Sequence, residues 1–244
     1  MIELIIPDWP APNRVRAVIT TRSGGVSGGP YLGLNLGDHV GDDAHRVAEN
    51  RARLRSQASL PAEPRWLNQV HGCAVAQCGF NGPAGTADAA TAVEAGVVCA
   101  VLTADCLPVL LCNRQGSRVA VVHAGWRGLA AGVIEAAISA FDDHPSEILA
   151  WLGPAIGPKA FEVGTEVRTR FVEGCPSDAS CFQAHRTGHW LADIYRLARN
   201  RLNRVGLLDI SGGGDCTFSD PERFYSFRRD GITGRMATLI WLTE

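Results

Sequence analysis

The fold is decided by the stretch "GVVCAVLTADCLPVLLCNRQGSRVAVVHAGWRG", which covers residues 96–128. It contains three apolar runs of strand length, at 97–103, 108–112 and 118–123. An acid, Asp105, and a thiol, Cys106, stand between the first two runs, and a histidine, His123, ends the third. Since packing alone does not require such groups in a core, their position indicates a functional site.

The period of the apolar residues changes after His123. From Leu129 to Phe141 they recur at helical spacing, which predicts one helix leaving the strand that carries His123. A second helix is predicted at 44–57 with Asp42 as its cap, and a third at 190–206. Further predicted strands lie at 14–20, 66–78, 147–157, 207–215 and 235–242.

These elements predict a mixed α+β fold. Pro108 and the hairpin-like turn at 113–116 favour a mixed sheet over a purely parallel one. No internal repeat or linker divides the chain, so we expect a single domain over residues 1–244.

Composition excludes several classes of protein. The 244 residues carry a formal net charge of −2, which is not the basic surplus of proteins that bind nucleic acid or anionic membranes. We therefore expect a small-molecule partner. The N-terminal segment resembles neither a signal peptide nor a membrane span, so a cytoplasmic location is expected. The 8 cysteines include no C-x-x-C pair, and reduced thiols are expected.

Two histidines and a cysteine form the first candidate site. Cys106 lies at a strand break and His123 at a strand end, where open α/β sheets present side chains to a cleft. Adding His71 gives two imidazoles and a thiolate, a ligand set that leaves the fourth position of a catalytic zinc open. Cys73 competes with Cys106, because a strand over 66–78 would place Cys73 on the same face as His71. The spacing leaves this choice open.

Polar and aromatic groups flank these three residues. Gln69 and Asp105 are candidates for orienting the imidazoles, and Asp105 is also a candidate general acid or base. Trp126 and Phe227 are more typical of a core than of a platform on which a base stacks.

Candidate anion and substrate contacts lie in three segments. The segment 24–37, with six glycines, follows Arg22 and contains Asn35; it predicts either an anion nest or a tight surface turn. It lacks the Lys and Ser/Thr of a P-loop. Arg127, next to a predicted helix start, and Arg228 are further candidate contacts.

Several motifs together resemble the laccase-domain family, also described as multicopper polyphenol oxidases and as bacterial purine nucleoside phosphorylases. They are "TTRSGGVSGGPYLGLNLGDHVGDD", "NQVHG", "TADCLPVLL", "VAVVHAGWRGL", "LGPAIGP" and "DPERFYSFRRDGITGRMATLIW". The resemblance covers nearly the whole chain. It implies two mixed β-sheets packed as a sandwich with helices outside, and one metal ion bound by His71, Cys106 and His123.

The activity that this resemblance implies is phosphorolysis of adenosine, inosine and methylthioadenosine to the base and ribose 1-phosphate, with adenosine deamination as a side activity. The partners would then be purine nucleosides and phosphate; the sequence does not give the oligomeric state. Zn²⁺ suits the ligand set and would lower the pKa of its water towards about 7, although Cu²⁺ is possible. With seven histidines and no His-X-His pair, the chain lacks the usual mark of a four-copper oxidase.

Two alternatives stay open. Cys106 as nucleophile with His123 as base would give an amide hydrolase, and action on peptidoglycan precursors has been attached to relatives. A single copper at the same site would give a weak polyphenol oxidase. A binding protein without turnover is a further class that the sequence does not exclude.

Overall fold

Two β-sheets packed face to face form the centre of the fold. The structure is a computed structural model, and it describes residues 1–81 and 85–244. The first sheet has the order β1-β2-β14-β6-β3. Its strands are β1 Leu4–Ile5, β2 Val15–Thr20, β14 Met236–Leu242, β6 Cys99–Thr103 and β3 Arg65–Trp66. All its pairs are antiparallel except β3 with β6.

The second sheet contains most of the stretch that opened the sequence analysis. Its order is β13-β9-β7-β8-β5-β4. Its strands are β13 Ile210–Gly212, β9 Ile148–Leu152, β7 Leu107–Asn113, β8 Val119–Ala124, β5 Ala89–Ala92 and β4 Val75–Gln77. The two outermost pairs are parallel and the inner three are antiparallel. The α+β class and the sandwich of two mixed sheets are thus confirmed.

Burial on both faces explains why β7 reads as an unbroken apolar run. Leu110 and Cys112 face the first sheet, where they pack with Val101 and Ile240. Leu107, Val109 and Leu111 point the other way, into the cluster formed with the helices. Because alternate side chains of a strand point to opposite faces, a strand in an inner layer needs apolar residues at every position.

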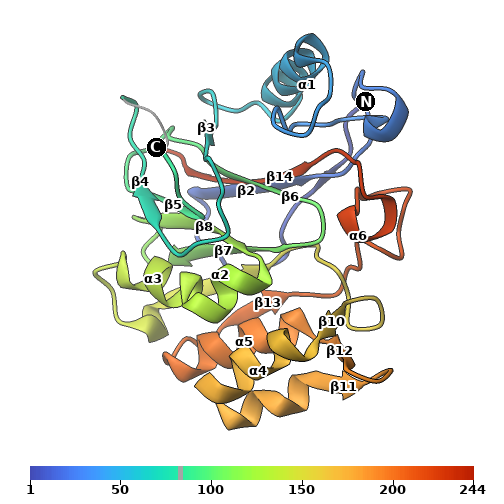
Figure 1. Cartoon of the computed structure of the whole chain (residues 1–244). Coiled ribbons are helices and arrows are strands. Elements are labelled where there is room, and N and C mark those ends of the chain that lie inside the picture. Colours follow the sequence, from blue (N-terminus) through green and yellow to red (C-terminus); the bar gives the residue numbers. More distant parts are fainter. Residues whose placement is uncertain (82–84) are drawn as a thin grey trace.

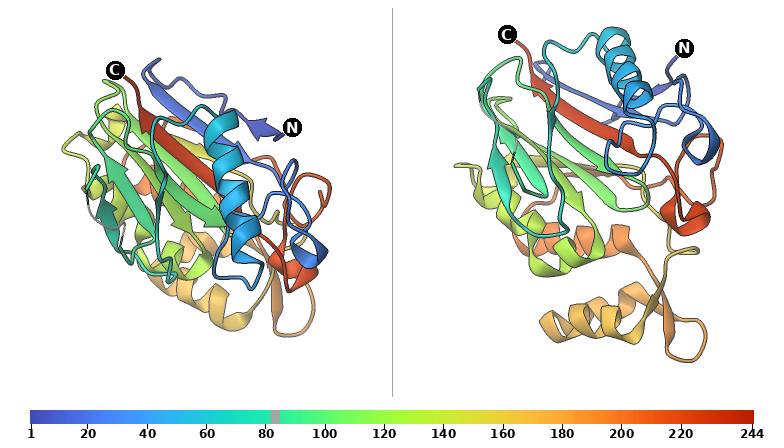
Figure 2. Two further views of the ribbon diagram at one scale, coloured as in Figure 1. Left: turned by 90° about the horizontal axis from the view of Figure 1, so that it is seen from above. Right: turned by 45° about the horizontal axis from the view of Figure 1, so that its top comes forward.

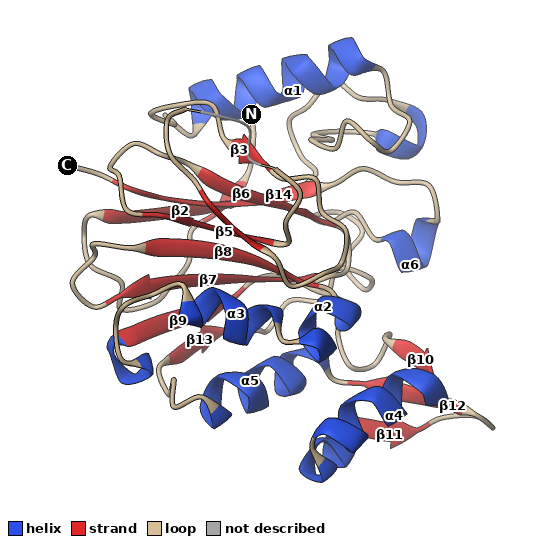
Figure 3. Cartoon of the chain, turned by 60° about the vertical axis from the view of Figure 1, so that its left-hand side comes forward, coloured by secondary structure: helices blue, strands red, loops and turns tan. Residues whose placement is uncertain are grey.

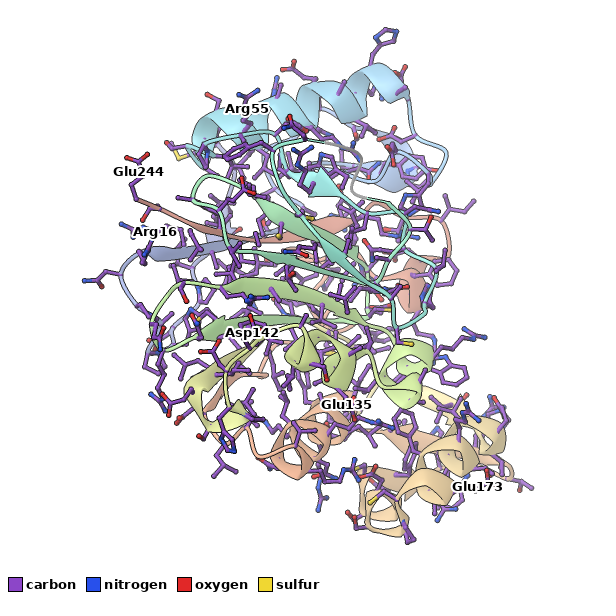
Figure 4. The ribbon with its side chains drawn as sticks, turned by 90° about the vertical axis from the view of Figure 1, so that its left-hand side faces the viewer. Arg16, Arg55, Glu135, Asp142, Glu173 and Glu244 are labelled. Atoms are coloured by element: carbon purple, nitrogen blue, oxygen red, sulfur yellow. The ribbon has the colours of Figure 1, made fainter. Side chains whose placement is uncertain are left out.

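Helices cover the outer faces of both sheets (Figures 1 and 2). Helix α1, Ala44–Gln57, covers the first sheet through Leu54, which packs with Leu34, Leu36 and Leu239. The outer face of the second sheet is covered by α2 Trp126–Ala131, α3 Val133–Ser139 and α5 Ile194–Arg204. An ion pair between Arg201 and Glu135 (labelled in Figure 4) links α5 to α3 with a 2.7 Å contact.

A third, small sheet was not expected from the sequence. It has the order β10-β12-β11, with β10 Glu162–Gly164, β12 His189–Ala192 and β11 Phe182–Ala184. Together with helix α4, Thr165–Gly174, it lies at one side of the molecule beside α5 (Figure 3). The predicted helix 190–206 is wrong at its start, because 190–192 belong to β12. The helix begins after Asp193, whose side chain accepts a hydrogen bond from the Arg196 backbone N–H.

Three other local predictions are wrong. The strand predicted at 66–78 is two short strands, β3 and β4, separated by a loop that contains His71. The single helix predicted after His123 is two, α2 and α3, because Gly132 between them has a left-handed φ of 99°. The cap of α1 is Asp43 and not Asp42. No helix within residues 1–81 and 85–244 is both long and apolar enough to span a membrane.

Candidate metal centre

The structure brings His71, Cys106 and His123 together from three separate segments. Their ligand atoms all lie within 4.8 Å of one another. The Cys106 Sγ is 3.8 Å from the His71 Nε2, and the two imidazole rings meet edge to face with centroids 4.8 Å apart. His71 is exposed, Cys106 is half-buried and His123 is buried, so the cluster opens to solvent on the His71 side.

His123 is oriented by a buried aspartate that sequence reasoning missed. The Nδ1 of His123, near the end of β8, is 2.8 Å from the Asp88 Oδ1. This contact leaves the Nε2 to face the cluster. A carboxylate on the far nitrogen fixes the tautomer of a metal-binding imidazole and raises its basicity.

Asp88 also shapes the loop that carries His71. Its carboxylate accepts backbone hydrogen bonds from Val70, His71 and Gly72, at 3.2, 2.8 and 2.7 Å. The bonds hold His71 at a φ of 61°, a conformation that a strand does not allow. One carboxylate therefore positions both imidazoles. The available signal was its place in "TADAATA", directly before the residues that form β5; its complete burial is visible only in the structure.

Cys106 is presented by the break between β6 and β7. Asp105 precedes it with a φ of 95°, which is rare for a residue other than glycine. The Asp105 carboxylate accepts hydrogen bonds from the Thr217 hydroxyl at 2.6 Å and from the Arg228 backbone N–H at 2.7 Å. Asp105 therefore anchors helix α6, Phe227–Asp230, and makes no hydrogen bond to either imidazole.

The surroundings favour the charged form of the thiol. Burial raises the pKa of Cys106, but the positive charge of His123 and hydrogen bonds from both histidines outweigh it and lower that pKa to about 6. Burial lowers the pKa of His123, while the Cys106 thiolate and Asp88 raise it to about 9. By contrast, burial alone raises the pKa of Cys112 to about 12. The metal-free cluster therefore favours a thiolate beside an imidazolium, and metal binding would use the thiolate and displace the proton from His123.

The donor set and the space fit one metal ion. Two imidazoles and one thiolate are ligands that zinc accepts, with room for a fourth. Gly125 lies against the cluster, and a Cβ there would stand 2.9 Å from the His71 Cδ2 and 3.0 Å from the Cys106 Sγ. Cys73 is exposed and does not belong to the group. Within the described residues this is the one group of three or more such ligands, which does not match a four-copper centre.

The cluster lies in a pocket of about 420 Å³. Two of the predicted substrate contacts, Gln69 and Arg127, line it. The Gln69 amide is occupied by both backbone groups of Leu102, at 2.9 and 2.7 Å, so it joins the His71 loop to β6. Arg127 is exposed and its guanidinium lies 4.5 Å from the Trp126 ring centroid.

The other predicted contacts lie outside the pocket lining. Arg22 donates to the carbonyls of Pro221 and Leu32, and Arg228 donates to the carbonyl of Glu162. Asn35 is buried and bonds to Gly37 and Asp42.

The glycine-rich segment, for which an anion nest and a tight surface turn were both predicted, packs closely against other parts of the chain. The amides of Val26, Ser27, Leu34 and Gly37 are bonded to the protein itself. Gly33 meets the Arg22 backbone so closely that a Cβ would stand 1.9 Å from its carbonyl oxygen. Gly33 therefore allows the chain to pack tightly against itself.

Besides Leu102, Thr103 and Ala104, three residues that sequence reasoning did not assign to the site line the pocket: His39, Phe227 and Arg235. Phe227 was expected in the core but is 59% exposed, because α6 places it at the pocket and not under the sheet. Burial lowers the pKa of Arg235 below its usual value, and the nearby Cys106 and Asp105 offset this only in part. His39, Phe227 and Arg235 all lie in motifs that carry the family resemblance. The sequence did not show that the N-terminal and C-terminal motifs meet at one pocket.

Fold and site together define a class: α+β sandwich proteins with a His, Cys, His cluster built from the ends of two central strands and the loop that carries His71. The chain belongs to the family described as multi-copper polyphenol oxidoreductase laccase, whose family model matches residues 16–243. A purine nucleoside phosphorylase of Shigella flexneri is 54% identical over 99% of this chain and 100% of its own length. One from Pseudomonas aeruginosa is also 54% identical, over 98% of each chain.

Solved structures agree with this assignment. A crystal structure of a Neisseria meningitidis protein of family DUF152 superposes with a TM-score of 0.95 at 48% identity and covers 99% of both chains. The crystal structure of YlmD from Geobacillus stearothermophilus has a TM-score of 0.90 at 31% identity and covers 99% of this chain and 100% of its own.

Proposed function

We propose that this protein is a zinc-dependent purine nucleoside phosphorylase that acts on adenosine, inosine and methylthioadenosine. The observation that carries the proposal is the His71, Cys106 and His123 cluster, open to a pocket, in a chain 54% identical to relatives named purine nucleoside phosphorylase. Zinc would be held by these three side chains. When bound, it supplies a Lewis acid that polarises a phosphoryl oxygen or a water.

The protein's own groups would prepare the site. The Asp88 carboxylate holds the His123 ring through Nδ1 and the His71 backbone through its N–H, so the His123 ring and the backbone that carries the His71 ring are in place before a ligand arrives. Phe227 offers an exposed aromatic ring at the pocket, which suits stacking on a purine base. Asp105 holds α6 in place and thereby positions Phe227.

Product analysis tests this proposal. Adenosine is incubated with the zinc-loaded protein, with and without phosphate, and the products are separated by chromatography. We expect adenine and ribose 1-phosphate only with phosphate, and inosine at a lower rate without it as the proposed deamination side activity. Absence of adenine under both conditions would contradict the proposal.

A second candidate function has one observation in its favour. The lowered pKa of Cys106 beside His123 also suits a thiol nucleophile with an imidazole base, as in an amide hydrolase acting on peptidoglycan precursors. The two candidates differ in their inhibitors. A hydrolase of this kind keeps its activity in a chelator, whereas the phosphorylase loses its activity when zinc is removed.

The copper-dependent oxidation of phenols, the other alternative, predicts oxygen uptake that depends on added copper.

A further inference from the structure

Two arginine side chains lie at the pocket beside the cluster. Arg127 and Arg235 line it, and none of its lining residues is an aspartate or a glutamate. A concave site with cations and no carboxylates attracts an anion. These two arginines therefore favour a ligand that carries negative charge close to the metal ligands.

Arg235 is the cation best placed to bind that anion. Its Nη1 donates to the carbonyls of Thr233 and Gly234, at 2.9 and 3.0 Å. Its Nε and Nη2 have no hydrogen-bond partner within the described part of the chain, and no ion pair is formed there with an acid. One edge of the guanidinium is thus fixed by the protein, and the other is left to a ligand.

The surrounding residues hold Arg235 in this position. The Asn35 Oδ1 accepts a hydrogen bond from the Arg235 backbone N–H at 2.9 Å, immediately before β14 begins. The side-chain stem packs on Gly37, where a Cβ would stand 2.8 Å from the Arg235 Cγ. The conformation of the arginine is therefore set before a ligand binds, which reduces the entropy lost on binding. Asn35 acts on Arg235 and not on the ligand directly.

We propose that Arg235 binds the phosphate co-substrate through its Nε and Nη2, with Arg127 at the exposed side of the same pocket. A planar pair of N–H donors matches two phosphate oxygens. This inference rests on the proposed phosphorylase function and specifies which residue holds its second substrate. It replaces Arg22 and Arg228, which the protein's own carbonyls occupy.

Substitution of Arg235 tests the proposal with two readouts on zinc-loaded protein. The first is binding of inorganic phosphate by calorimetry, and the second is the KM for phosphate and for adenosine measured separately. Arg235→Gln removes a charged donor pair, so we expect phosphate affinity to fall on the order of ten- to a hundredfold, with the adenosine KM and the zinc content unchanged. Arg235→Lys keeps the charge and should lose less. Arg16→Gln, exposed on β2 (Figure 4), is the matched control and should bind phosphate as the wild type does.

Chemical modification of arginines in the wild-type protein tests the proposal even if the variants do not fold. Phenylglyoxal modifies arginines, and mass spectrometry locates the product. We expect saturating phosphate to slow modification of Arg235 but not of Arg16. Unchanged phosphate affinity in Arg235→Gln, or no protection of Arg235, overturns the inference. Phosphate binding that depends on Arg235 in a protein that releases no adenine would instead contradict the proposed function and leave the anion site standing.

Discussion

At the scale of single residues, one buried carboxylate organises the site. The Asp88 Oδ1 lies 2.8 Å from the His123 Nδ1. It also accepts a hydrogen bond of 2.8 Å from the His71 backbone N–H. The residue pattern singled out Cys106 and His123 at strand ends but left Cys73 and Cys106 as alternatives, and the resemblance to the laccase-domain family supplied the set of three proposed ligands. It missed Asp88 because an aspartate 35 residues from His123 becomes its partner only when β5 pairs with β8.

Replacing Asp88 should weaken metal binding without removing a ligand. In Asp88→Asn the His123 tautomer is no longer fixed by a carboxylate, and we expect zinc affinity to fall about ten- to a hundredfold. Competition with a chromophoric chelator measures it. Asp105→Asn is the control, since Asp105 flanks Cys106 without bonding to either histidine, and asparagine tolerates a positive φ. Equal losses of affinity in both variants would refute the role given to Asp88.

The thiol of Cys106 should show a pH dependence that depends on metal. In the metal-free protein its pKa is about 6. The thiolate is the reactive form, so its alkylation rate should rise as the pH increases through about 6 and then level off. Zinc should suppress this reaction. Cys73 is exposed outside the cluster and should react at the same rate with and without zinc. Mass spectrometry of iodoacetamide-treated protein separates the two cysteines.

At the scale of elements, the strands of the central stretch were predicted well and the segments between them were not. The runs in β6, β7 and β8 are apolar because both faces of each strand are buried, and this signal is local. The loop at His71 reads as an alternating strand, yet Asp88 holds it in a turn through contacts that are distant in sequence. The break between helices α2 and α3 depends on the left-handed backbone conformation of Gly132.

That glycine gives a prediction about stability. Gly132 has a φ of 99° and its nearest neighbour to a new Cβ is the Glu135 Oε2, at 3.7 Å, so Gly132→Ala creates backbone strain without a clash. We expect the free energy of unfolding to fall by about 1–2 kcal/mol. Gly174→Ala is the control, because Gly174 is the last residue of α4 and a Cβ there would meet no other atom within 4 Å. This substitution should leave the free energy of unfolding unchanged or raise it by up to about 1 kcal/mol. Urea denaturation measures both. A more stable Gly132→Ala variant would contradict the assignment.

At the scale of the whole molecule, the α+β class and the two-sheet sandwich were predictable, but the meeting of distant segments was not. Residues from the N-terminal loop, the centre and the C-terminal motif, such as His39, Cys106 and Arg235, line one pocket. Each motif was visible in the sequence. Their convergence depends on the order of strands, in which β14 pairs between β2 and β6.

Metal binding at this convergence should stabilise the entire fold. A ligand that binds only the folded state at about a thousand times its Kd adds about 4 kcal/mol. For a chain of this size each kcal/mol raises the Tm by about 2–4 °C, so a chelator should lower it by roughly 10 °C. Cys106→Ala should lose most of this response. Calorimetric scans with and without chelator measure the difference, and an identical response in the variant would argue against Cys106 as a ligand.

The most direct test of the central claim joins metal content to phosphorolysis in one sample. Metal-free protein is titrated with zinc, and phosphate-dependent release of adenine from adenosine is measured at each step. We predict that the rate rises in proportion to bound zinc up to one ion per chain and that Cys106→Ala stays inactive throughout. Full adenine release by the metal-free protein, or no release at one zinc per chain, would contradict the account.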